Sequence, residues 1–130
     1  MCGQAGGEVS EVQVRRIYDA ATPGDGTRVL VDRIWPRGIS KARAHLDEWC
    51  KQIAPSTELR KWYQHDPKLF DEFVRRYRDE LTDSGRAEAL AHLHDLVKRQ
   101  TLTLLTASKA VDISEAAVLA DLLATGSGND

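Results

Sequence analysis

The spacing of apolar residues divides the chain into short strands near both ends and helices between them. Residues 12–18 (VQVRRIY) and 28–32 (RVLVD) are short and β-branched, which predicts two strands separated by a Pro-Gly-Asp-Gly turn. These two strands could pair as a hairpin. Residues 101–108 (TLTLLTAS) form the most convincing apolar run, and we predict a third strand there.

Helical spacing dominates the region between the second and third predicted strands and returns after the third. Ser56 is placed to cap one helix, and Asp66 followed by Pro67 is typical of the start of another. Ser114 marks the start of the last helix. The predicted helices cover residues 46–53, 57–64, 67–81, 86–100 and 114–123.

These elements predict an α/β fold with a small mixed or parallel sheet of about three strands, flanked by about five helices. The long connection between the second and third strands favours parallel pairing, because such crossovers usually carry helices that pack on the sheet. We expect one domain over residues 12–123. The Gly-rich segments 1–11 and 124–130 are expected to be flexible ends.

Composition excludes several classes of protein. The chain has 130 residues, a net charge of -2 and 29% charged residues, which is typical of a globular domain and unlike a general polyanion binder. Cys2 and Cys50 are too few for a disulfide framework and lack the spacing of a metal site. With no apolar run long enough for a membrane span, we expect a cytoplasmic protein.

Charge is distributed unevenly along the chain. Between residues 13 and 43 there are seven Lys or Arg residues and three acids. An alternative function is therefore that of a regulatory module that binds nucleic acid or protein through the basic segment 15–43. The sequence identifies no cofactor and does not determine the oligomeric state.

The strongest candidate site lies where the second predicted strand ends. In open α/β sheets, ligands bind beyond the carboxyl ends of the strands, so the residues after this strand and after the third one should meet. Arg33, Arg37 and Lys109 would then form a pocket for a carboxylate or phosphate. Such a pocket could serve binding alone or an enzymatic step. Trp35 or Trp62 would supply a flat face for stacking.

Each candidate has a structural alternative. Trp35 could fill the core beneath a turn, and Arg33 could pair with Asp32 or another acid. His65 or Asp32 could carry a proton, but His65 also suits packing at the start of the following helix, and the structural explanation is favoured there. Cys50 falls among apolar residues and is expected to be a core residue rather than a nucleophile.

Several motifs together resemble the YeaO-like proteins, a bacterial family of small cytoplasmic proteins with a domain of unknown function. They are DRIWPRG from residue 32, LDEW from 46, APS from 54, LRKW from 59, HDP from 65 and RY from 76. The resemblance covers about residues 12–123. It implies no established activity.

The segment after the third strand departs from related sequences. More distant relatives carry a Cys-His-Arg cluster there, which would suit thiol chemistry. In this chain the segment reads AVDISEAAVL, without cysteine or histidine. An Asn-rich stretch expected in YeaO-like proteins is also replaced, by DISEA. Both departures argue against a covalent cysteine mechanism and against a polar role for that segment.

Overall fold

A parallel sheet forms the centre of the protein. The computed structural model describes residues 11–126. Its strands are β2 (Val12–Arg16), β3 (Thr27–Leu30), β4 (Glu48–Trp49) and β5 (Leu102–Thr106). Their order is β2-β5-β3-β4, and each neighbouring pair is parallel. The predicted α/β class is therefore confirmed, with one strand more than expected.

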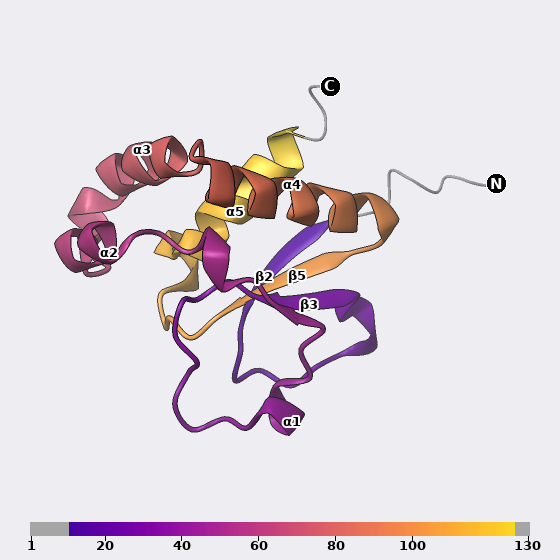
Figure 1. Ribbon diagram of the computed structural model, residues 1–130. Coiled ribbons are helices and arrows are strands. Elements are labelled where there is room, and N and C mark those ends of the chain that lie inside the picture. The colour runs from indigo at the N-terminus through magenta and orange to yellow at the C-terminus, as the bar shows by residue number, and fades with distance from the viewer. Residues whose placement is uncertain (1–10, 127–130) are drawn as a thin grey trace.

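The central strand of this sheet is β5, which lies between β2 and β3 (Figure 1). All five of its residues are buried, as expected for a strand covered on both faces. The prediction that the first two strands could pair as a hairpin is wrong, because β5 lies between β2 and β3. The flexible ends predicted for the chain fall mostly on residues 1–10 and 127–130, which lie outside the described residues.

Within residues 11–126, five α-helices accompany the sheet: α1 (Lys41–Ala44), α2 (Thr57–Tyr63), α3 (Phe70–Glu80), α4 (Ser84–Arg99) and α5 (Glu115–Gly126). Ser56 caps α2 as predicted, because its hydroxyl accepts a hydrogen bond from the Leu59 amide at 3.1 Å. Asp66 caps a short 3-10 turn, Pro67–Leu69, that leads into α3. The sequence thus located most helix starts correctly.

The helix predicted over residues 46–53 is wrong, and the sheet explains why. Leu46 and Trp49 pack on one face of the sheet, whereas Cys50 and Ile53 belong to the core on the other face. One helix cannot reach both faces, so the chain crosses the sheet edge in extended form and pairs with β3 as β4. A 3-10 turn, Lys51–Ile53, follows.

Two hydrophobic cores result, one on each face of the sheet. The larger core lies under α2–α5, where strand residues such as Val29 and Leu104 meet Phe73, Tyr77 and Leu119. The smaller core lies on the side of α1 (Figure 1). It is built from Ile17, Leu30, Ala44 and Leu105, with Trp35, Ile39, Leu46, Trp49 and Ala107 packed against them.

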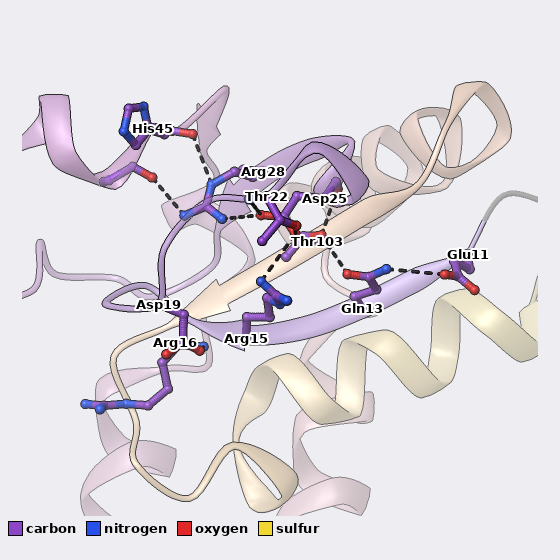
Figure 2. A network of polar contacts seen from close by, with 11 residues as sticks. Glu11, Gln13, Arg15, Arg16, Asp19, Thr22, Asp25, Arg28, His45 and Thr103 are labelled. Carbon is purple, nitrogen blue, oxygen red and sulfur yellow. Dashed lines mark hydrogen bonds and ion pairs between the residues drawn. The ribbon is translucent and has the colours of Figure 1, made fainter.

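A buried ion pair completes the face with the smaller core. Asp25 and Arg28 are 1% and 4% exposed, and Arg28 Nη1 donates to Asp25 Oδ2 at 2.6 Å. Arg28 also donates to the carbonyl groups of His45 and Ala44, at 3.1 and 2.9 Å, so it ties α1 to the sheet (Figure 2). Burial alone would raise the pKa of Asp25, but hydrogen bonds from Thr22 and Arg28 hold it below its usual value.

Gly26 lets the chain pass from this ion pair into β3. Its φ is 63°, and a Cβ atom there would lie 2.1 Å from the carbonyl oxygen of Thr101. The close approach permits the Thr27 amide to donate to that same oxygen at 2.9 Å. The turn between the first two strands therefore requires glycine at this position.

We expect Asp25→Ala to lower the free energy of unfolding by about 3–5 kcal/mol, because it leaves the Arg28 guanidinium buried without its partner. Urea denaturation monitored by circular dichroism measures the change. Glu72→Ala is the control, since Glu72 pairs with Arg75 and Arg76 on the surface and its loss should have a clearly smaller effect. Equal effects of the two substitutions would contradict a structural role for the buried pair.

Candidate functional site

A cavity of about 440 Å³ opens at the carboxyl edge of the sheet. It lies where the chain leaves β3 and β5. These two strands are parallel neighbours, so the residues that follow them lie at the same edge of the sheet. The first residue of α5 and the end of α2 complete it. Its polar lining includes Asp32, Arg33, Arg60, His65, Ser108 and Glu115, and its apolar lining includes Ile34, Pro55, Tyr63 and Phe73.

Asp32 joins the two strand ends that form the floor of the cavity. Its Oδ1 accepts a hydrogen bond from the Thr106 hydroxyl, and its Oδ2 accepts one from the Ala107 amide, both at 2.8 Å. The Asp32 carbonyl accepts a third, from Trp49 Nε1, at 2.8 Å. These contacts fix the carboxylate in one orientation.

Glu115, at the start of α5, lies beside this fixed carboxylate. Burial and a hydrogen bond with Asp32 raise the pKa of Glu115 well above its usual value, and the nearby Arg60 only partly offsets this. Two neighbouring carboxyl groups repel each other when both are ionised, so Glu115 holds its proton to a higher pH than an exposed glutamate does.

Two guanidinium groups border the same cavity. Arg60 is held in place because its Nε donates to the Pro55 carbonyl at 3.3 Å and its Nη2 donates to Thr57 Oγ1 at 3.1 Å. Arg33 is exposed at the rim. Neither arginine forms an ion pair with an acid among the described residues, so both can bind an anion.

Tyr63 and His65 shape the wall between α2 and α3. The Tyr63 hydroxyl donates to the Ile113 carbonyl at 2.7 Å. Burial, with the charges of Asp112 and Asp66, raises the pKa of Tyr63 to about 12, so it remains protonated at neutral pH. His65 has φ of 56° and its ring lies 5.7 Å from that of Tyr63. A left-handed histidine is uncommon, and here it turns the chain toward the cavity.

The structure brings together only some of the site residues predicted from the sequence. Asp32, Arg33 and His65 line the cavity, whereas Trp35, Arg37, Trp62 and Lys109 do not. Trp35 packs edge-on against Trp49 in the smaller core, with ring centroids 5.4 Å apart. Trp62 lies under the Arg76 guanidinium, at 4.2 Å from the ring centroid, in a separate open groove.

Two charged residues of the cavity, Arg60 and Glu115, were not predicted from the sequence. Glu115 directly follows Ser114, the predicted start of the last helix, so its position was a usable signal, although the DISEA segment was not expected to have a polar role. Arg60 gave no such signal, because its place depends on how α2 packs beside the strand ends. In residues 11–126, no three His, Cys, Asp or Glu side chains are grouped as a metal site.

The raised pKa of Glu115 predicts a pH dependence of stability. The folded state holds this proton more tightly than the unfolded state, whose pKa is near 4.5. The stabilisation is therefore complete below that pH and is lost as pH rises through the folded-state pKa. We expect Glu115→Gln to remove this decline and to raise the melting temperature relative to wild type at pH 8. Calorimetry from pH 5 to 9 measures it, and parallel curves for the two proteins would contradict the prediction.

Comparisons with known proteins agree with the resemblance seen in the motifs. A protein of Mycobacterium tuberculosis, described as uncharacterised, is 53% identical over 114 residues, which cover 88% of this chain and 94% of the relative. YeaO of Escherichia coli, also described as uncharacterised, is 45% identical over 112 residues, which cover 86% and 96%. No solved structure gives a significant match. Along residues 11–126, no helix has the length and apolar character to cross a membrane.

A family model extends this relationship to almost the whole chain. It is described as the inactive DUF488-N3 subclade, and it matches residues 11–128. The match includes every strand and helix of the sheet fold and all residues that line the cavity. The chain therefore belongs to the YeaO-like proteins of the inactive DUF488-N3 subclade.

Proposed function

We propose that the protein binds a small molecule bearing a carboxylate or phosphate in the cavity at the carboxyl edge of the sheet. The observation that carries this proposal is the presence of Arg33 and Arg60 on one cavity, neither engaged by an acid among the described residues. The same cavity holds the carboxyl groups of Asp32 and Glu115, and the raised pKa of Glu115 reduces the negative charge that opposes an anion there. The balance of charge favours an anion.

The rest of the lining supports a ligand with an apolar body. Tyr63, Phe73 and Pro55 form an apolar wall, and Ile34 is 68% exposed at the rim. An exposed isoleucine costs little to cover, and burying it against a ligand is favourable. A volume of about 440 Å³ lies in the range of small-molecule sites.

Binding without turnover agrees best with the available groups. The family description reads inactive, and both carboxylate oxygens of Asp32 already accept hydrogen bonds within the protein. An enzymatic step would rest on His65, with Asp32 as the second candidate for carrying a proton. Arg37 and Lys109 lie outside the cavity lining, so Arg60 takes their place in the proposal.

The alternative, a nucleic-acid or protein-binding module using the basic segment 15–43, receives less support. Arg28 is buried in its pair with Asp25, and Arg15 lies 3.4 Å from the same carboxylate. Both arginines therefore interact with Asp25 of the same chain. The remaining positive charge of the segment is spread over exposed positions such as Lys41 and Arg43.

Thermal-shift screening against inorganic phosphate and a panel of carboxylates and phosphate esters tests the proposal, because a ligand that binds only the folded state raises the melting temperature. We expect Arg60→Ala and Arg33→Ala each to weaken binding roughly 10- to 100-fold, as the loss of a charge-assisted hydrogen bond does. Titration calorimetry with the best ligand measures the factor.

The matched control is Arg43→Ala, which removes an exposed arginine from the basic segment but not from the cavity. Binding should be unchanged in this variant. Undiminished ligand binding in both cavity variants would contradict the proposal. Salt-dependent binding of an oligonucleotide that is lost in Arg43→Ala and retained in Arg60→Ala would favour the nucleic-acid alternative.

A further inference from the structure

The cavity is lined by both basic and acidic side chains, and the acidic ones form no ion pair with a described cationic side chain. Neither Asp32 nor Glu115 forms an ion pair with any described Lys, Arg or His side chain. Arg60 acts on Glu115 only through its charge, because its Nε and Nη2 are held by Pro55 and Thr57. The anion-binding function proposed above leaves this acidic corner of the cavity without a role.

Both acidic residues lie on one cavity. Asp32 is held by hydrogen bonds from Thr106 and Ala107, and Glu115 lies at the first position of α5, where it lines the same cavity. A proton on Glu115 relieves the repulsion in the absence of any other cation. An ammonium group would relieve it as well, because it offers several donors to two carboxylates at once.

We propose that the ligand is a zwitterion whose ammonium group binds Asp32 and Glu115 while its carboxylate or phosphate binds Arg60 and Arg33. The inference rests on the function proposed above and names the chemical class of its ligand. Free amino acids and related amino-carboxylates or amino-phosphates belong to this class. Their apolar side chains would lie along Tyr63, Phe73 and Ile34.

Proton release accompanies this binding. The ammonium group of the ligand keeps its protons, and Glu115 releases its carboxyl proton to solvent. In the complex the carboxylates of Asp32 and Glu115 then contact the ammonium group, while the ligand's anionic group contacts the two guanidinium groups. The other titratable and charged groups near Glu115 are Asp32 and Arg33 after β3, Arg60 and Tyr63 on α2, His65 after it, and Tyr77 on α3. Affinity should therefore rise with pH up to the pKa of Glu115.

Titration calorimetry on the intact protein tests the inference with pairs of probes. Each of the common amino acids is compared with the carboxylic acid of the same skeleton that lacks the amino group, and with the corresponding amine. We expect at least one amino acid to bind roughly tenfold or more tightly than both of its partners. Repeating the titration in two buffers of different ionisation enthalpy should reveal a released proton.

Glu115→Gln provides the decisive variant. It keeps a neutral side chain of the same shape, so the carboxylic acid should bind as in wild type, whereas the preference for the amino acid should disappear. Asp112→Asn is the matched control, since it removes a nearby acid that does not line the cavity, and it should keep the preference.

The outcomes separate this inference from the proposed function. Equal affinity for the amino acid and its carboxylic acid, with both weakened by Arg60→Ala, would overturn the zwitterion and leave anion binding intact. Tight binding of the simple amine alone would also overturn it. If no probe binds and inorganic phosphate gives no signal either, both proposals fail.

Discussion

The pairing of β5 between β2 and β3 is the constraint on which the rest of the molecule depends. Its five residues are buried on both faces, and the hydrogen-bond ladder continues past the strand ends, where the amides of Ile17 and Val31 donate to Thr106 and Leu105. This brings the chain after β3 beside the chain after β5. Asp32 then joins the two exits through Thr106 and Ala107. The cavity exists because these strands are parallel neighbours.

The arginines of the basic segment show how one residue type serves two purposes. Arg28 is buried and bound by Asp25 and two carbonyl groups, so its charge stabilises the face with the smaller core (Figure 2). Arg33, five positions later, is exposed on the rim of the cavity and carries no ion pair among the described residues. Net charge along the sequence cannot separate these roles, because burial decides them. The proposed ligand site uses only the second kind.

Local signals in the sequence were sufficient for most of the fold. Strands with continuous apolar runs and the longer helices with Ser, Asp or Pro near their starts were placed correctly, because these signals depend on neighbouring residues. The short helix α1, capped by Ser40, was not predicted. The failures at residues 46–53 and at the hairpin depend on contacts across the sheet: Leu46 and Ile53 belong to different faces. The candidate site likewise has a part that the sequence predicted and a part that depends on tertiary contacts. The crevice was predicted from the rule that ligands bind beyond the carboxyl ends of parallel strands, whereas Arg60 was brought there by the packing of α2, which no local pattern records.

The proposed binding of anions between Arg33 and Arg60 at the carboxyl edge of the sheet is tested most directly by titrating the ¹⁵N-labelled protein with inorganic phosphate. The titration is followed through the arginine Nε–Hε and backbone amide signals. We expect shifts to concentrate on Arg33, Arg60 and the amides of Ala107 and Ser108. Shifts concentrated instead on Arg75, Arg76 and Arg78 of α3, or none below high phosphate concentration, would contradict it.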